Sequence, residues 1–247
     1  MSSAHPVRDS PGDMPATLPA VVTRDYTLHS RRLTIAEFDG SAAADGVANE
    51  IAAQHGEVTS IAFEDGDTVL DIGAHVGVVS IWLAKLFPAV RIIALEPMPE
   101  VFGLLVRNLA ANAVGNVLPL NLAVTGDGRP VHLVSNPWTN SGGSTAQLRN
   151  MSLPGHLHRR CPSVTLDELF DRFAIETCPL LKIDCEGSEY EILHASDRLG
   201  RIDHVRGEFH ENDFLRDKGY SAQRLARYLA ARVRGTVTYT YCEMANL

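Results

Sequence analysis

The sequence contains few cysteines, and their spacing is that of neither a metal motif nor a disulfide framework. Four are present among 247 residues, namely Cys161, Cys178, Cys185 and Cys242. They form no CxxC pair and lack the regular spacing of small disulfide-linked domains. This pattern fits reduced thiols, and it predicts a cytoplasmic protein.

Positive charge is also scarce. Thirty acidic residues stand against twenty-two Lys and Arg, which gives a formal net charge of −8 at pH 7. Such a chain repels phosphate backbones and anionic lipid, so we expect no nucleic-acid partner and no membrane partner. Residues 1–20 lack a basic stretch followed by an apolar core, which disfavours a secretory signal, and we expect them to form a disordered tail.

From residue 66 onward the sequence alternates regularly between apolar strands and helices. Strands are predicted at 67–72, 90–95, 116–125, 179–184, 202–209 and 235–243. Helices are predicted at 76–87, 99–113, 188–195 and 222–233. Strands that are apolar on both faces and separated by helices indicate a mostly parallel sheet with helices on both faces. The sequence therefore predicts an α/β, doubly wound, Rossmann-like domain over residues 66–247.

Two segments fall outside this alternation. Residues 21–65 are predicted to form an N-terminal extension of two short strands, with a turn near Ser30, and a helix over 44–55. Residues 135–161 are too long for a simple connection, which predicts an inserted hairpin or lid that binds substrate. In this loop, Trp138 either covers an apolar part of the substrate or anchors the loop itself.

Polar residues close to this loop have a structural interpretation. Thr165 and Glu168 have the spacing of a capping box, at the start of a helix in "SVTLDELFDRF". His156 and His158, in "HLHRR", have no Cys or acid at ligand spacing, so we expect solvated loop residues rather than a zinc site.

The loop "DIGAHVG" follows the first strand of the alternation and predicts a nucleoside site. Gly73 allows a tight turn and close approach of a ligand to the backbone, and Asp71 and Gly77 complete the pattern D-x-G-x-x-x-G. A dinucleotide site would have glycine at the position of His75. An anion is disfavoured beside Asp71, whereas the ammonium group of an amino acid is favoured there.

The second strand of the alternation ends in "ALEP", which places Glu96 twenty-three positions after Gly73. A carboxylate at that place can accept hydrogen bonds from both hydroxyls of a ribose. The glycine loop and Glu96 together describe a cationic nucleoside amino acid, S-adenosylmethionine, and disfavour a nicotinamide cofactor.

Four acids lie within eight positions after the strand at 179–184, in "LLKIDCEGSEYEIL". Ser188 and Glu191 have capping-box spacing, and Glu189 falls in the first helical turn, where the helix dipole favours negative charge. We expect these residues to be structural. Asp184 and Glu186 precede the helix at the strand end, so we expect them to contact substrate, cofactor or a catalytic base.

These stretches carry a resemblance to a known family. "VLDIGAHVGVVSIWLAK", "IALEPMPEVFGLLVRNLAAN", "VTLDELF" and above all "LLKIDCEGSEYEIL" resemble the FkbM family of S-adenosylmethionine-dependent methyltransferases, over about residues 66–211. The resemblance implies a class I methyltransferase fold and methylation of a hydroxyl on a sugar, polyketide or other small natural product.

The resemblance also implies a set of cofactor-binding positions, here Asp71, Gly73, Gly77, Glu96, Pro97, Asn121 and Ala123. Asn121 and Ala123 would form the wall near the adenine. The family usually has Asn where this chain has His75, which we place in the cofactor loop with its contact to the methionine carboxylate left open.

Methyl transfer to a hydroxyl requires that the protein exclude water, align the acceptor and remove a proton. Glu208 and His210, in "VRGEFHE", are two positions apart and can point the same way. With an ordinary pKa of ~6.5, His210 is the favoured general base, the alternative being a loop histidine bonded to a neighbour. Glu208 either assists in catalysis or forms a structural ion pair with Arg206.

A metal ion is a further alternative at the same strand end. Asp184 and Glu186 could hold Mg²⁺, which would lower the pKa of the acceptor hydroxyl, although nothing in their spacing requires an ion.

The sequence therefore predicts an S-adenosylmethionine-dependent methyltransferase whose partner is a small-molecule acceptor, most consistent with O-methylation. Transfer to a nitrogen or a carboxylate, a dehydrogenase, and a non-catalytic small-molecule-binding domain are the alternatives. The oligomeric state is not predicted.

Overall fold

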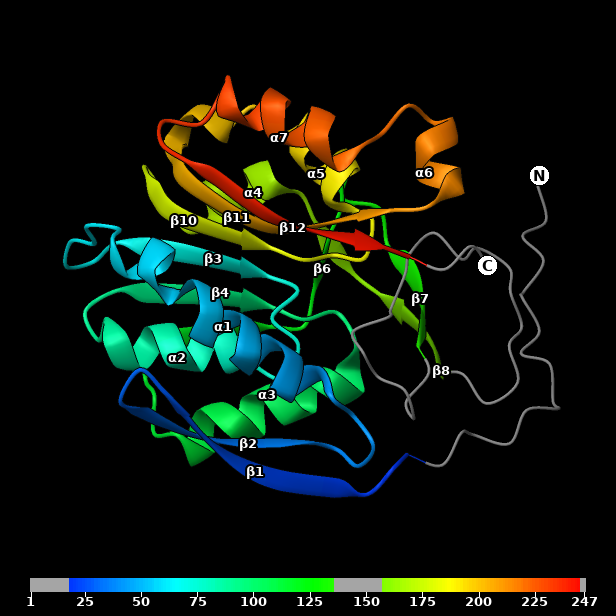
Figure 1. Cartoon of the computed structure of the whole chain (residues 1–247). Helices are drawn as coiled ribbons and strands as arrows, with labels where there is room; N and C mark the ends of the chain where they lie inside the picture. The colour runs from blue at the N-terminus through cyan, green and yellow to red at the C-terminus, as the bar shows by residue number, and fades with distance from the viewer. Residues whose placement is uncertain (1–17, 136–156, 245–247) are drawn as a thin grey trace, which may run out of the picture.

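A six-stranded parallel sheet forms the centre of the protein in a computed structural model that describes residues 18–135 and 157–244 (Figure 1). Its strands are β3 (Thr68–Ile72), β4 (Arg91–Leu95), β5 (Val117–Leu120), β10 (Cys178–Ile183), β11 (Ile202–Glu211) and β12 (Val237–Glu243). The spatial order is β12-β11-β10-β3-β4-β5, and each neighbouring pair runs parallel. The predicted doubly wound α/β fold is confirmed.

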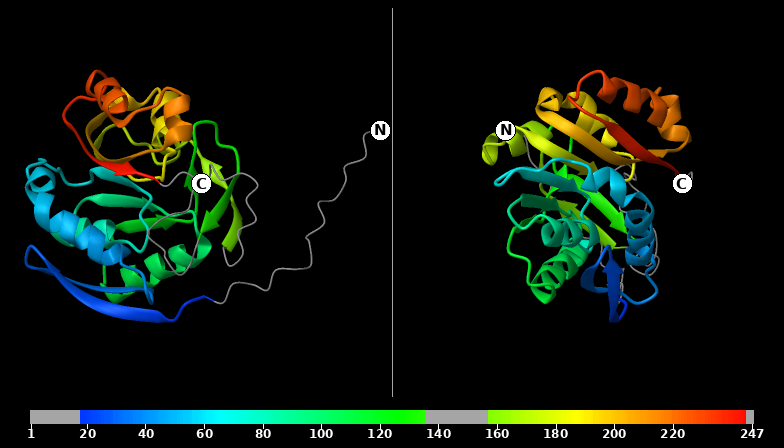
Figure 2. Two further views of the ribbon diagram at one scale, coloured as in Figure 1. Left: turned by 45° about the vertical axis from the view of Figure 1, so that its right-hand side comes forward. Right: turned by 60° about the vertical axis from the view of Figure 1, so that its left-hand side comes forward.

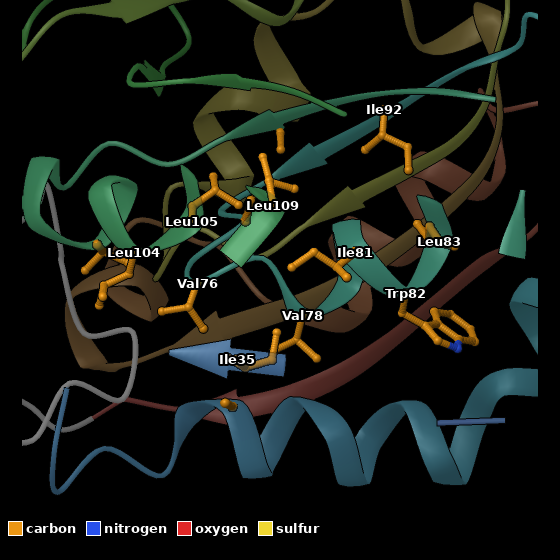
Figure 3. Close-up of a cluster of buried hydrophobic side chains, with 14 of the residues drawn as sticks. Ile35, Val76, Val78, Ile81, Trp82, Leu83, Ile92, Leu104, Leu105 and Leu109 are labelled. Atoms are coloured by element: carbon orange, nitrogen blue, oxygen red, sulfur yellow. The ribbon is translucent and has the colours of Figure 1, made fainter. Parts of the chain in front are cut away.

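Helices cover both faces of this sheet (Figure 2). One face carries α1 (Ala43–Thr59), α2 (Val78–Leu86) and α3 (Pro99–Ala111). The other carries α4 (Leu166–Arg172), α5 (Glu189–Ala195), α6 (Asp213–Asp217) and α7 (Ala222–Ala230). Successive strand residues alternate between the two cores, so Ile92 packs under the first group and Ile93 under the second. Figure 3 shows part of the first core, which includes Ile81 of α2, Leu105 of α3 and Ile35.

The two predicted capping boxes have different outcomes. The box at the start of α4 is confirmed: Glu168 N–H donates to Thr165 Oγ1 at 3.1 Å, and Thr165 N–H donates to the Glu168 carboxylate at 2.8 Å. The box at α5 is wrong, because Ser188 has helical backbone angles and its side chain makes no capping hydrogen bond. Glu191 instead accepts two hydrogen bonds from Arg129, at 2.8 and 3.0 Å.

The strand predicted over 116–125 is also wrong in part. It divides into β5 and the short β6 (Ala123–Val124), which leaves the central sheet and pairs with β9 (Ser163–Val164). Between β6 and β9 along the chain, β7 (Val131–Ser135) pairs antiparallel with β8 (Leu157–Cys161). These two strands form the predicted inserted hairpin. His158 is exposed on β8, whereas Trp138 and His156 lie outside the described residues.

A β-hairpin precedes α1. Strands β1 (Val21–Leu28) and β2 (Arg31–Phe38) pair antiparallel through a two-residue turn at His29 and Ser30, where the turn was expected. Both turn residues have positive φ, of 45° and 66°, as tight two-residue hairpin turns require. Helix α1 runs to Thr59, four residues beyond its predicted end.

Asn108 of α3 and Asn112 at the C-cap of that helix close the free edge of β2. Asn108, which is fully buried, accepts from Ala36 N–H at 2.7 Å and donates to Ala36 O at 2.9 Å. One helical turn later, Asn112 accepts from Thr34 N–H at 3.0 Å and donates to Thr34 O at 2.7 Å. The side-chain amides therefore supply the hydrogen bonds that a neighbouring strand would supply.

No helix in the described part of the chain has the length and apolar character that crossing a bilayer requires.

Candidate active site

The strand order reverses between β3 and β10. The chain proceeds from β3 to β4 on one side of this point and from β10 to β11 on the other. Loops that diverge at such a point leave a crevice beyond the carboxyl ends of the strands, where doubly wound sheets bind ligands. A cleft opens there, and it encloses about 650 Å³ together with the solvent at its mouth. We refer to it as the switch-point cleft.

Gly73 allows the loop after β3 to lie against the end of β10. Its φ is 79°, and a Cβ added to it would lie 1.8 Å from the carbonyl oxygen of Asp184. Gly77, with φ of 90°, is the N-cap of α2, and its missing Cβ makes room for Leu105 of α3. Gly73 lines the switch-point cleft, whereas Gly77 lies outside its wall and supports helix packing.

Asp71 lies beneath the cleft rather than in its wall. Its fully buried carboxylate accepts a hydrogen bond from Ser80 Oγ at 2.5 Å and lies 3.5 Å from Lys182 Nζ. Lys182 donates to Gly73 O at 2.7 Å and lies 3.6 Å from the Asp184 carboxylate. Although burial opposes its charge, these two carboxylates raise the pKa of Lys182. Asp71 therefore fixes the glycine loop through Lys182, where the sequence predicted a direct contact with the ligand.

Glu96 faces the cleft from the end of β4. It is almost fully buried, and its two carboxylate oxygens accept hydrogen bonds from His75 N–H at 3.0 Å and Met98 N–H at 2.8 Å. Burial raises the pKa of Glu96 to about 7, against the opposing effect of the two amides. Each oxygen keeps a further lone pair, so the predicted role toward ribose hydroxyls is compatible with this geometry.

The residues near Glu96 either line the cleft or support the turn that follows β4. Pro97 and Ala123 line the cleft, while Asn121 donates to the carbonyl oxygens of Glu96 and Pro97, at 2.8 and 3.0 Å, and holds the turn. His75 also lines the cleft, and burial lowers its pKa to about 4, so its ring is neutral at pH 7. Glu96, its neighbours Pro97 and Ala123, and His75 therefore line the cleft as predicted, whereas Asn121 lies outside its wall.

His210 lies at the centre of a cluster of carboxylates on the β10 and β11 side. Its Nδ1 is 3.0 Å from Glu189 Oε1, and its Nε2 is 3.5 Å from Glu186 Oε2 and 4.0 Å from both Asp184 and Glu208. The side chain is nearly fully buried, which opposes its charge, yet these carboxylates raise the pKa of His210 to about 9. The ring therefore carries its proton at neutral pH and cannot accept another, which argues against the predicted general base.

Glu189 is the member of this cluster whose contact with His210 sequence reasoning missed. It is fully buried, and Oε1 accepts from Cys185 N–H at 2.7 Å as well as facing His210. The sequence assigns Glu189 only to the helix dipole, since its approach to a strand twenty-one residues later leaves no local pattern.

Glu186 is the acid of this cluster that reaches the cleft. It lines the wall with a φ of 52°, and the next residue, Gly187, has φ of 93°, so the chain turns sharply here. Burial raises the pKa of Glu186 to about 7, while His210 opposes the shift. A carboxylate with this pKa can accept a proton near neutral pH.

The cluster contains two groups of residues whose side chains could ligate a metal ion, within the described part of the chain. Asp184, Glu189 and His210 form one, and Glu208, His210 and Cys242 the other. Both depend on His210, whose proton competes with an ion for the ring. Mg²⁺ at Asp184 and Glu186 stays an alternative, as it was from the sequence.

Comparisons with known proteins identify a family. The family model of the methyltransferase FkbM domain matches residues 71–235. The methyltransferase sdnD of Sordaria araneosa is 25% identical in an alignment of 155 residues that covers 52% of this chain and 60% of that protein. The chain thus spans 60% of the length of that curated relative. The crystal structure of a precorrin-6y C5,15-methyltransferase from Geobacter metallireducens has 19% identity and a TM-score of 0.42, covering 71% of this chain and 69% of that one.

Proposed function

Because the chain belongs to the FkbM methyltransferase family, we propose that it transfers a methyl group from S-adenosylmethionine to a hydroxyl of a small molecule. The charge of the switch-point cleft is the observation that carries the choice of cofactor. Glu96, Asp184 and Glu186 line it, and no Lys or Arg is among its described lining residues. A sulfonium cofactor is attracted to such a wall, while the pyrophosphate of a dinucleotide is repelled.

The residues present fit S-adenosylmethionine in three respects. Glu96 offers carboxylate lone pairs to ribose hydroxyls, and the apolar residues Pro97, Leu122 and Ala123 offer a surface for adenine. Asp184 and Glu186 offer negative charge to the cationic half of the cofactor. A side chain at position 73 would fill the space between the two loops, so Gly73 keeps this part of the cleft open.

When bound, the cofactor supplies an activated methyl group: the acceptor oxygen forms a bond to the methyl carbon, the carbon–sulfur bond breaks with its electron pair going to sulfur, and the hydroxyl proton leaves. Glu186 is placed to take that proton. His210 holds Glu186 and Glu189 by charge, and Glu189 fixes the loop through Cys185 N–H. His210 is therefore a positioning residue in this proposal.

Binding calorimetry with S-adenosylmethionine, S-adenosylhomocysteine and NAD tests the choice of cofactor. We expect both methionine-derived nucleosides to bind and NAD not to bind. Binding of NAD alone would contradict the proposal, and binding of the nucleosides without any methyl transfer would favour a non-catalytic domain.

Phenol, aniline and benzoate, each supplied with S-adenosylmethionine carrying a labelled methyl group, test the acceptor atom. Only the hydroxyl needs a base at neutral pH, so Glu186 favours phenol. Faster labelling of aniline or benzoate would instead support the N-methyl or carboxyl-methyl alternative.

We also expect methyl transfer to persist after dialysis against EDTA, because His210 supplies the positive charge that an ion would add to the carboxylate cluster. Loss of at least tenfold in rate, restored by Mg²⁺, would establish the metal alternative at Asp184 and Glu186.

A further inference from the structure

A second cavity, of about 530 Å³, lies between α1 and the central sheet. Its walls come from α1, α2, β10 and β11, so it occupies the sheet face opposite α5 and α7. Asp184 lines both this cavity and the switch-point cleft. Asp184 is therefore shared by the two spaces, and our proposed function assigns its negative charge to the cationic half of the cofactor.

We propose that this cavity is the acceptor pocket of the enzyme, and that the acceptor is a largely apolar, uncharged alcohol with a second oxygen. The inference rests on the proposed methyl transfer and names the substrate class for it.

Five of the twelve residues that line the pocket are aliphatic, and most of the surface that the wall exposes is apolar. These are Ile51 and Val58 of α1, Val79 and Leu83 of α2, and Leu180 of β10 in the sheet. Apolar walls of this kind gain free energy from burying hydrocarbon, roughly 25 cal/mol per Å². A sugar, whose surface is covered with hydroxyls, would leave many hydrogen bonds unmade against such a surface.

The charged residues of the pocket exclude an anionic acceptor. Arg206 forms ion pairs with Glu50 at 2.9 Å and with Glu57 at 3.3 Å. Lys182 is held by Asp71, Asp184 and the Gly73 carbonyl, as described above. Both cations of the pocket are thus already matched by protein carboxylates, while Glu208 adds a further acidic side chain to the wall. A phosphate or carboxylate on the acceptor would meet more negative than positive charge.

Trp82 offers a polar contact in the pocket wall. The residue lines the pocket from α2 and is 2% exposed, and its Nε1 has no hydrogen-bond partner among the described residues. Figure 3 shows its indole ring projecting from α2. A buried N–H without a partner is costly, and a carbonyl or ether oxygen of a bound acceptor would remove that cost.

Tryptophan fluorescence offers a test that does not depend on turnover. The chain has two tryptophans, so Trp138→Phe leaves Trp82 as the sole reporter. With S-adenosylhomocysteine present, this variant is titrated with decahydro-2-naphthol and with the matched anion decahydro-2-naphthoate. We expect a saturable change in Trp82 emission with the alcohol, and binding of the carboxylate at least tenfold weaker.

Filling the pocket should abolish this binding. Val58→Phe fills it from α1 and Val79→Phe from α2, so that one variant remains if the other does not fold. Val106→Phe, at a position of α3 that is 43% exposed, is the matched control and should bind as the reporter variant does. Calorimetry should give an affinity for S-adenosylhomocysteine within about twofold in all of them.

Three results would overturn the inference: no saturable change with the alcohol, equal binding of the carboxylate, or unchanged binding in both filled variants. If S-adenosylhomocysteine binds while the alcohol does not, the acceptor pocket is refuted and the proposed cofactor stands. If S-adenosylhomocysteine itself does not bind, the proposed function fails first, and this inference fails with it.

Discussion

At the strand ends, Glu186 rather than His210 has a pKa that suits it to accept a proton near neutral pH. An isolated histidine releases its proton near pH 6.5 and an isolated glutamate near pH 4.3. Here burial raises the pKa of Glu186 to about 7, while the surrounding carboxylates raise that of His210 to about 9. At pH 8 the carboxylate is free to accept a proton and the imidazole is not.

Replacement of Glu186, the proposed base, gives the first test of this assignment. In Glu186→Gln, we expect the rate of transfer to a hydroxyl to fall by roughly 10²- to 10⁴-fold, the usual contribution of a general base. In the unmodified protein kcat/KM should rise with pH to a plateau above about 7, and this inflection should disappear in the variant. Glu176→Gln, at an exposed position that lines neither cavity, is the matched control. An unchanged inflection in Glu186→Gln would assign the base to another residue.

The charge of His210 should appear in the stability of the protein. A pKa raised from 6.5 to about 9 means that the folded state binds the proton more tightly, so this stabilisation is present below pH 6.5 and disappears as pH rises through 9. The difference corresponds to about 3 kcal/mol. Urea unfolding of the unmodified protein at pH 6.5 and 9.5 should show this loss.

His210→Asn should remove most of that pH dependence and lower the stability at pH 6.5, because Glu189 would be left buried without its cation. His132→Asn, at an exposed position of β7, should keep the dependence of the unmodified protein. Equal slopes in both variants would argue against a charged His210.

At the scale of helices, strands and loops, the switch-point cleft depends on how closely the β3 loop approaches β10. In Gly73→Ala the new methyl group would lie 1.8 Å from the Asp184 carbonyl, and φ of 79° would be strained for alanine. We expect the loop to shift and binding of S-adenosylhomocysteine to weaken at least tenfold, measured by calorimetry.

Gly103→Ala is the matched control for that change. Gly103 is exposed inside α3, and a Cβ there would meet no atom within 4 Å. The substitution should stabilise the protein by roughly 0.5–1 kcal/mol, the helix preference of alanine over glycine, and leave ligand affinity unchanged. Similar weakening in both variants would mean that the close approach at Gly73 is not what shapes the site.

Some features of the fold and the site follow from the local sequence, and others depend on distant contacts. Buried strands, helices and the turn glycines follow from local patterns, and so do Glu96 and Glu186 at strand ends. The protonation of His210 does not, because it depends on Glu189 from another element. The path of β6 away from the sheet and the pairing of β2 with Asn108 likewise depend on contacts distant in sequence.

At the scale of the whole molecule, the N-terminal hairpin and α1 contribute to the same core as the region that matches the family model. Leu33, Ile35 and Phe38 of β2 are buried in it. Each such side chain contributes roughly 1.5–3 kcal/mol when buried, and whole domains have only about 5–15 kcal/mol of stability. Ile51 and Val58 of α1 also line the second cavity.

A fragment of residues 66–247 should therefore fail to fold cooperatively, although it contains the whole match at 71–235. We expect a broad thermal transition by circular dichroism and no binding of S-adenosylhomocysteine. Removal of residues 1–17 alone leaves all described contacts in place and serves as the control. A cooperative, ligand-binding 66–247 fragment would show that the hairpin and α1 are dispensable.

The asparagine clamp on β2 has a consequence for the order of events during synthesis. Ala36 and Asn108 are 72 residues apart, so at ordinary translation rates the hairpin leaves the ribosome roughly 4 to 14 s before its partner amides. During that interval the edge of β2 is open to pairing with other nascent chains. Protection of this edge is thus a late event, completed only when α3 has emerged and folded.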